Sequence, residues 1–291
     1  PEAVSNYGND LMADLLLILD GPMHFSGKPT LVFGNRGISS ITLKTFGPKT
    51  PQHSGHYGNY IPNPALRLSQ ILSSMKSEDG RVTIPGFYDG ISLTDEIKEV
   101  LNNVPPAEKA IQLRTKINSV DKVGSNYQES IQYPSLNIRG LQSGWVGDQV
   151  RTIIPSTATA EIDVRLVLES NPEKLMEYIQ NHIKSLGYKI FLDLKFHDIT
   201  NTVIQSCIAA SSLGIWMLNI HSSSGKNTMV NSKINLVNNN YATLLLGVTI
   251  LTSLDEKENI VSDMLQEHCN DIFNDLGKAK YCLLYTSPSP R

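Results

Sequence analysis

The chain has 291 residues, and its 25 lysines and arginines stand against 28 aspartates and glutamates, so the formal net charge is −3. Hydrophobic residues make up 40% and charged residues 18%, a mixture typical of globular proteins that excludes extended disorder. At roughly 150 residues per domain, this length predicts about two domains. Because the sequence has no overall basic charge, we expect neither nucleic acid nor a membrane among its partners.

Cysteine usage and apolar runs bear on the location of the protein. The three cysteines, Cys207, Cys269 and Cys282, are too few for a disulfide framework, so we expect a reducing, cytoplasmic environment. The longest apolar runs, residues 15–19 and 242–251, are too short to cross a bilayer.

Strand patterns and two amphipathic helices fill the chain up to residue 187. Asn63 with Pro64, and Asn171 with Pro172, are typical helix starts, and Gly187 is a helix stop. Residues 36–187 therefore predict an α+β sandwich, a layer of strands covered by helices. Strands are predicted at 15–19, 31–33, 38–46, 136–138 and 158–168, a loop at 47–62 and polar helical segments at 94–119. The expected inward residues are Leu66, Ile71, Leu72 and Met75 in the first helix, and Leu175, Met176, Ile179, Ile183 and Leu186 in the second.

After Gly187 strands and helices alternate. The strands are apolar on both faces, which favours a parallel sheet or a piece of a βα barrel. We place a domain boundary at residues 184–190, where a helix runs into a buried strand without a linker. The predicted strands are 190–194, 215–220 and 242–251, and the predicted helices are 203–213 and 260–276.

Several strings in residues 1–187 resemble the carnosinase / acetylornithine deacetylase family of zinc metallopeptidases: LLLILDG, FGNRGISSITLKTFGP, QHSGHYGNYIPNPA, RVTIPGFYDGI, PSLNIRGLQSGWVG and VRTIIPSTATAEIDVRLV. The resemblance implies a two-zinc catalytic domain interrupted by a lid, or dimerisation, domain. Residues 1–35 then correspond to the end of the first catalytic half and residues 36–187 to the lid. The family pairs through an edge strand and a helix, so the resemblance implies a homodimer that acts on peptide-like substrates.

By motif, this family resemblance makes Asp20 a zinc ligand, His53 a catalytic histidine that stabilises the developing oxyanion, and Arg165 a grip for a substrate carboxylate. Each has a simpler alternative: a turn cap for Asp20, a surface loop histidine for His53, and an ion-paired strand arginine for Arg165. Arg36 is interpreted as a structural arginine. The family also needs an early HxD motif, a Glu-Glu pair and a late histidine, which we do not find, so we expect an incomplete zinc site.

Residues 188–281 resemble a different family, orotidine 5'-phosphate decarboxylase, on the strings IFLDLKFHDITNT, LGIWMLNIHSSSG and GVTILTSL. Asp193 and Lys195 are two residues apart on a strand, so their side chains are expected on one face. The resemblance implies that Lys195, with Asp193 and Asp198, protonates the carbanion left by carbon dioxide, without any cofactor. It also assigns Thr202 and Ser253 to orotidine monophosphate binding, and Thr200 replaces the usual proline. The alternative is a solvated ion-pair cluster, and the expected fold is a partial barrel.

The last ten residues, 282–291, fit neither family and resemble the translation of a sequencing-library adapter. A natural disordered tail is the alternative. Three functional hypotheses follow. The first is a zinc-dependent dipeptidase fragment fused to a partial decarboxylase and inactive in this form. The second is an orotidine 5'-phosphate decarboxylase of pyrimidine biosynthesis. The third is a non-catalytic self-association module. The sequence leaves open whether the fusion is natural.

Overall fold

The computed structural model describes residues 6–8, 12–14, 23–30, 32 and 34–249. The strand expected at residues 15–19, the helix at 260–276 and the tail at 282–291 lie outside the described residues.

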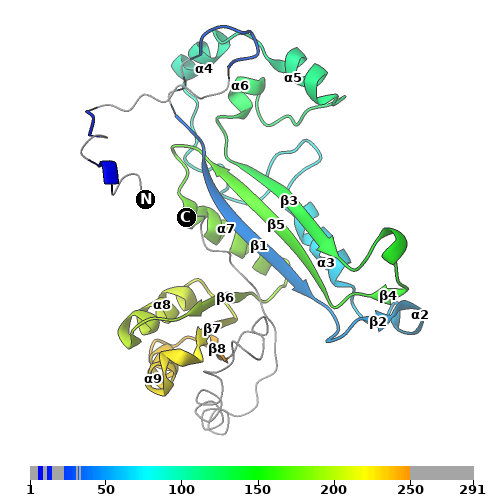
Figure 1. The fold of residues 1–291 in the computed structure, drawn as a ribbon, viewed down its shortest axis with the longest axis vertical. Coiled ribbons are helices and arrows are strands. Elements are labelled where there is room, and N and C mark those ends of the chain that lie inside the picture. Colours follow the sequence, from blue (N-terminus) through cyan, green and yellow to red (C-terminus); the bar gives the residue numbers. More distant parts are fainter. Residues whose placement is uncertain (1–5, 9–11, 15–22, 31, 33, 250–291) are drawn as a thin grey trace.

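A three-stranded antiparallel sheet runs diagonally through the middle of the view in Figure 1. Its order is β1 (Gly37–Phe46), β5 (Thr157–Leu166) and β3 (Ser135–Ser143). Helices α3 (Pro64–Ser74) and α7 (Pro172–Ser185) lie behind it in Figure 1. Alternate residues of β5 face these helices and are buried, as a period of two requires: Ala158, Ala160, Ile162 and Val164.

Helix α3 begins as the sequence predicts, because the side chain of Asn63 accepts hydrogen bonds from the backbone N–H groups of Ala65 and Leu66. The expectation that Leu66 faces inward is wrong, since its side chain is 60% exposed. Leu68 is buried instead. It shares the spacing i, i+3, i+4, i+7 with the other buried residues of this stripe, Ile71, Leu72 and Met75.

Helix α7 is capped by Asn171, whose side chain accepts from the N–H of Lys174. Its inward residues Leu175, Ile179 and Ile183 are buried. Leu186 is 42% exposed, against expectation, because the helix ends at Ser185 before another turn reaches the core. Gly187 has a φ of +87°, the left-handed conformation that the predicted stop requires.

Short elements cap the two ends of this sheet. The polar segment at 94–119 forms α4 (Asp95–Asn102) and α5 (Glu108–Thr115), followed by α6 (Tyr127–Ser130). The predicted loop at 47–62 contains β2 (Gln52–His53) and α2 (Ser54–Tyr57). Strand β2 pairs with β4 (Ile153–Ile154), which follows the 3₁₀ turn η1 (Gly147–Gln149).

A second, parallel sheet follows in the order β6 (Phe191–Phe196), β7 (Met217–His221), β8 (Leu244–Val248). Helix α8 (Thr200–Ser212) connects β6 to β7, while η2 (Ser222–Ser224) and α9 (Lys226–Asn238) connect β7 to β8. Helix α9 is not predicted from the sequence, because two of its four buried positions are the polar Thr228 and Ser232, which hide the apolar period. In the described residues the parallel strands form an open three-stranded sheet.

Each sheet has its own hydrophobic cluster, and Ile190 packs against both. We call β6 to β8 with helices α8 and α9 the second unit. Between α7 and this unit, the Lys184 ammonium donates to the carbonyl of Leu213 at 2.9 Å. The structure therefore contains an antiparallel α+β layer and a parallel βα segment, the mixed architecture that the sequence predicts, while the boundary at 184–190 stays a prediction.

Candidate functional site

The most buried charged group of the described residues lies on β6. The Asp193 side chain is fully inaccessible, and the ammonium of Lys195 lies 2.7 Å from its Oδ1 and 2.8 Å from its Oδ2. The Lys195 side chain keeps 18% exposure. The Lys195 ammonium thus contacts a buried carboxylate while part of its side chain stays exposed, an arrangement suited to proton delivery.

Asn219 on β7 completes this pair, and sequence reasoning missed it. Its Nδ2 donates to Oδ1 of Asp193, and its Oδ1 accepts from the backbone N–H of Lys195 at 2.7 Å. Asn219 is completely buried between the apolar Leu218 and Ile220 of this strand. A polar residue inside the apolar run WMLNI was the available signal, because a buried amide needs partners.

The structure describes two of the other three residues expected in this site, Asp198 and Thr202. Asp198 is exposed in the turn after β6, and its Oδ1 accepts from the N–H of Ile199. Thr202 is exposed in the first turn of α8. Thr200, at the position that usually holds proline, contacts Thr228 through its hydroxyl at 2.8 Å. Ser253 lies outside the described residues.

Two histidines stand beside the pair. The rings of His197 and His221 are 5.1 Å apart, and both rings contact the hydroxyl of Ser223. Burial, and next the neighbouring His197 and Lys195, lower the pKa of His221. These contacts give both histidines a structural role in the turn after β7.

The candidate residues of the first sheet are spread over its length. His53 is exposed and caps α2, with its Nδ1 accepting from the N–H of Gly55 at 3.1 Å, and its ring lies 4.6 Å from that of His56. Arg165 pairs with Asp163 on its own strand, at 3.1 Å from Nε to Oδ2. The described contacts of both residues agree with the simpler alternatives, and their catalytic assignments remain predictions.

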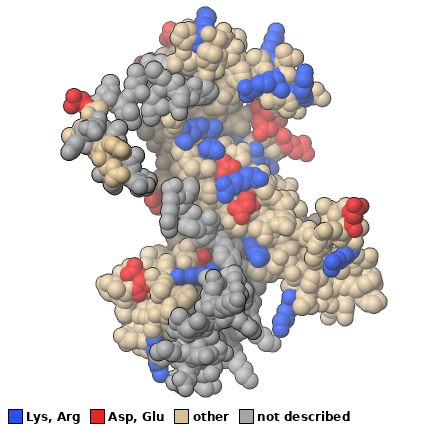
Figure 2. All heavy atoms as spheres, in the orientation of Figure 1, with Lys and Arg blue, Asp and Glu red and all other residues tan. Residues whose placement is uncertain are grey.

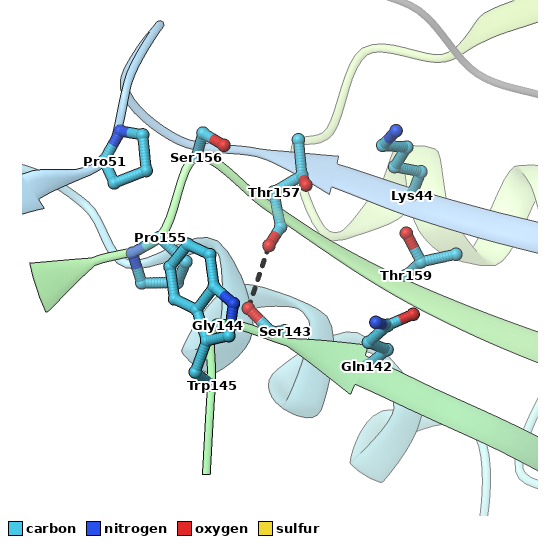
Figure 3. A pocket seen from close by; sticks show the side chains of 10 residues that line it. All are labelled: Lys44, Pro51, Gln142, Ser143, Gly144, Trp145, Pro155, Ser156, Thr157 and Thr159. Carbon is cyan, nitrogen blue, oxygen red and sulfur yellow. Dashed lines mark hydrogen bonds between the residues drawn. The ribbon is translucent and has the colours of Figure 1, made fainter. Parts of the chain in front are cut away.

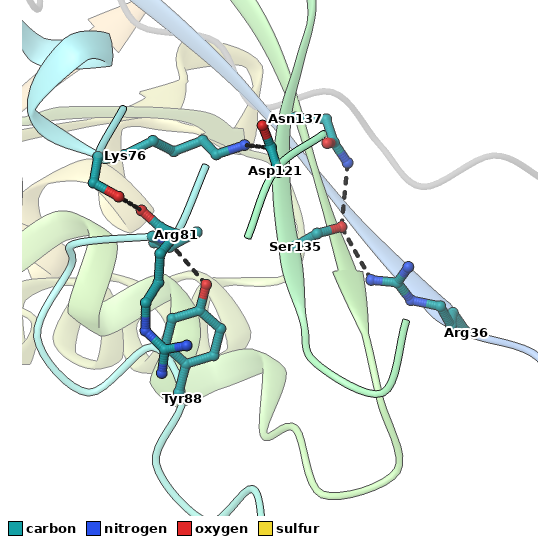
Figure 4. Close-up of polar contacts among 9 residues, drawn as sticks. Arg36, Lys76, Arg81, Tyr88, Asp121, Ser135 and Asn137 are labelled. Atoms are coloured by element: carbon teal, nitrogen blue, oxygen red, sulfur yellow. Dashed lines mark hydrogen bonds and ion pairs between the residues drawn. The ribbon is translucent and has the colours of Figure 1, made fainter. Parts of the chain in front are cut away.

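Arg36 ties the start of β1 to β3. Its guanidinium donates to the carbonyl of Tyr133 at 2.9 Å. It also donates to the hydroxyl of Ser135 at 3.0 Å, as Figure 4 shows. Burial, followed by the nearby charge of Arg165, lowers the pKa of Arg36. These contacts fit the structural interpretation of Arg36.

An open cleft of about 380 Å³ lies where the strands of the first sheet end near β4 (Figure 3). Lys44, Gln142 and Thr159 line one side and Trp145 and Pro155 the other. Figure 2 shows basic and acidic side chains interspersed over the middle of this view.

The described residues bring no three metal-ligating side chains together, and Asp20, the ligand expected from the sequence, lies outside them. Within the same part of the chain, no helix has the length and apolar character of a membrane span.

Two family models match the sequence. Residues 33–190 match the peptidase dimerisation domain, and residues 148–277 match the orotidine 5'-phosphate decarboxylase / HUMPS family. The first match covers more than half of the chain, so the chain belongs to the peptidase dimerisation domain family. The second match joins to it a segment of decarboxylase type. Both resemblances inferred from the motifs are thereby confirmed.

Curated relatives divide in the same way. The Cys-Gly metallodipeptidase DUG1 of Saccharomyces cerevisiae is 27% identical over 172 residues, 58% of this chain and 36% of that protein. The orotidine 5'-phosphate decarboxylase of Buchnera aphidicola subsp. Schizaphis graminum is 51% identical over 76 residues, 26% of this chain and 32% of that protein. The chain thus spans about a third of the length of the relatives it matches.

Among solved structures, an M20 family metallo-carboxypeptidase, Sso-CP2 from Sulfolobus solfataricus, superposes with a TM-score of 0.52 at 24% identity. The match covers 72% of this chain and 50% of that chain. This likeness establishes a shared fold.

Proposed function

We propose that residues 36–187 pair two copies of this chain through β3 and α3, as the dimerisation domain of a dipeptidase-type hydrolase. The supporting observation is that large apolar side chains are exposed on both elements. Ile138 and Leu141 on β3 are 46% and 59% exposed, and Leu66 on α3 is 60% exposed.

Strand β3 lies at an edge of its sheet, where a second chain can pair with it. Strand β3 bonds to β5 alone among the described strands, so its outer backbone groups face no described strand. Ile138 and Leu141 stand opposite the buried Ile162 and Ala160 of β5, on the side of the sheet where the helices pack. A second copy related by a twofold axis would cover these side chains and continue the sheet.

Light scattering after size exclusion tests the pairing. We expect twice the mass of one chain for the wild type, and dissociation of the dimer in Leu141→Asp. Leu168→Asp is the matched control, because Leu168 is 97% exposed outside β3 and α3. A wild-type chain that stays monomeric at high concentration would refute the proposal.

The hydrolase assignments of the remaining candidates are part of the same proposal. In this proposal Asp20 is a zinc ligand of the hydrolase. His53 stabilises the developing oxyanion, and Arg165 binds a substrate carboxylate. With a single ligand identified by motif, we expect zinc calorimetry of the 291-residue chain to give no tight two-site binding. Tight binding of two zinc ions would contradict this expectation. A cytoplasmic location, inferred from the cysteine pattern, belongs to the proposal as well.

A second candidate function, orotidine monophosphate decarboxylation, is favoured by the Asp193–Lys195 pair. In this role Lys195 gives the proton on its ammonium to the carbanion that remains when carbon dioxide leaves. Asp193 pairs with the Lys195 ammonium and faces the substrate carboxylate, while Asp198, Thr202 and Ser253 contact the substrate or the site of a second copy. The reaction needs no cofactor.

We expect the 291-residue chain to give no turnover. Its open sheet of three parallel strands provides one lysine–carboxylate pair but only part of the residues needed to bind the phosphate and the base of the substrate. The measurement is the loss of orotidine monophosphate absorbance, with Lys195→Ala as the control. Turnover that disappears in Lys195→Ala would show that the partial site is sufficient.

A further inference from the structure

We infer that Asn219 is the positioning residue of the Asp193–Lys195 pair: its carboxamide holds Lys195 in a left-handed backbone conformation that places the ammonium on Asp193. This inference rests on the second candidate function, because it assigns a residue to that same site.

The register between β6 and β7 sets up the geometry. Leu192 stands opposite Leu218, and Phe196 stands opposite Ile220. Three residues of β6, Asp193 to Lys195, therefore occupy the length that Asn219 alone occupies on β7. The extra residues make β6 bulge, and a bulged strand loses part of its ladder of backbone hydrogen bonds.

Lys195 takes up this excess length with a φ of +48°, a conformation that a residue with a long side chain rarely adopts in a strand. Its backbone N–H points to β7 and finds the Oδ1 of Asn219 at 2.7 Å in place of a carbonyl. The side chain of Asn219 thus supplies the hydrogen bond that the bulge removes from the ladder.

The other end of the same amide acts on the carboxylate. Nδ2 of Asn219 donates to Oδ1 of Asp193, the oxygen that also accepts from the Lys195 ammonium. The two partners fix the orientation of the amide, because the Lys195 N–H only donates and the carboxylate only accepts. An amide of this length meets both needs, whereas leucine meets neither and aspartate offers only acceptors.

The test compares Asn219→Leu with Thr243→Val in the full chain. Thr243 is also buried in the second unit, but its hydroxyl donates to the carbonyl of Ile215, away from the pair. Acetylation of lysines by acetic anhydride is followed by mass spectrometry, with the exposed Lys98 as internal reference. We expect Asn219→Leu to speed acetylation of Lys195 about fivefold relative to Lys98, and Thr243→Val to leave it unchanged. Equal rates in the two variants would overturn the inference.

A second measurement keeps the test decisive if Asn219→Leu fails to fold. In the wild type, the backbone amide of Lys195 should exchange its hydrogen more slowly than an unstructured peptide. This measurement on the wild type needs no variant, so it stands even if Asn219→Leu does not fold. Unprotected exchange in the wild type would refute the inference.

Neither readout needs a substrate, so the two ideas fail separately. If the chain shows the expected lysine reactivity and yet fails to bind orotidine monophosphate in calorimetry, the decarboxylase candidate is refuted. The positioning role of Asn219 would then remain as a structural role.

Discussion

The hydroxyl of Ser74 on α3 lies 2.9 Å from Nε2 of His182 on α7, and this contact joins the two helices that cover the first sheet. Ser74 already donates its proton to the carbonyl of Ile71 at 2.7 Å. It therefore accepts from His182, which requires a proton on Nε2 and is satisfied by a neutral ring. Burial lowers the pKa of His182 below its ordinary value of 6.5, which favours the same neutral form.

Acidification should destabilise the fold through this histidine. Above pH 6.5 His182 is neutral in both the folded and the unfolded chain, so its full contribution is present. As the pH falls through 6.5 the unfolded chain takes up a proton first, and stability drops until the folded chain is protonated too. Urea unfolding at pH 7.5 and 5.5 measures this loss.

His182→Gln is the control, because glutamine keeps an N–H donor without titrating. It should reduce the loss without abolishing it, since the pKa of His221 is lowered as well. Glu108 and Glu129 do not act in this window: hydrogen bonds from the backbone of Tyr127 and from Ser125, respectively, lower their pKa values, so their contributions disappear only at more acidic pH. An unchanged loss in His182→Gln would contradict the assignment.

Two residues that the sequence places on one helix face should differ in their effect on stability. Ile179→Ala removes a side chain that is 3% exposed in the first core and should cost about 2–5 kcal/mol of unfolding free energy. Leu186→Ala, at a position 42% exposed, should cost roughly 0.5 kcal/mol or less. Denaturant titration of both variants checks the difference, and equal losses would mean that α7 packs otherwise.

Removing the Lys195 ammonium should destabilise the second unit. Lys195→Ala leaves the fully buried Asp193 carboxylate without its cation, a change that costs about 3–5 kcal/mol in comparable buried pairs. A partial, poorly supported barrel, as the sequence predicts, would lose little stability on this substitution, and the burial of Asp193 argues for the opposite.

The matched control for this substitution is Lys98→Ala, which breaks an exposed pair with Asp95 on α4 and should change stability by less than about 1 kcal/mol. Asp193→Asn together with Lys195→Ala should recover part of the loss, because no charge then stays buried. Thermal unfolding of the three variants decides the matter, and a harmless Lys195→Ala would disprove the prediction.

The Cys207 thiol should not react with alkylating reagents in the folded protein. It lies on α8 with no exposed surface, and burial raises the pKa of its thiol to about 11. At pH 8 the reactive thiolate is therefore scarce, and the reagent cannot reach it. Iodoacetamide labelling followed by peptide mass spectrometry should find Cys207 unmodified in buffer and modified in urea. Labelling of the native chain at the rate of a free thiol would contradict the packing of α8.

Local signals in the sequence determined much of the fold. Features that depend only on neighbouring residues can be predicted without a structure. They include the helix starts at Asn63 and Asn171, the helix stop at Gly187 and the alternation along β5. Helix α9 was hidden because polar residues fill half of its buried positions. Leu66 and Leu186 were misplaced because helix phase and helix end are set by what the helix packs against.

The candidate site divides along the same line. Asp193 and Lys195 can be paired from the sequence, since they are two residues apart on one strand and carry a family motif. The contact with Asn219, 24 residues beyond Lys195, and the left-handed backbone of Lys195 emerge only when the chain is folded. Both depend on the register of β7 against β6, which is set by the packing of two strands that a helix separates in the sequence.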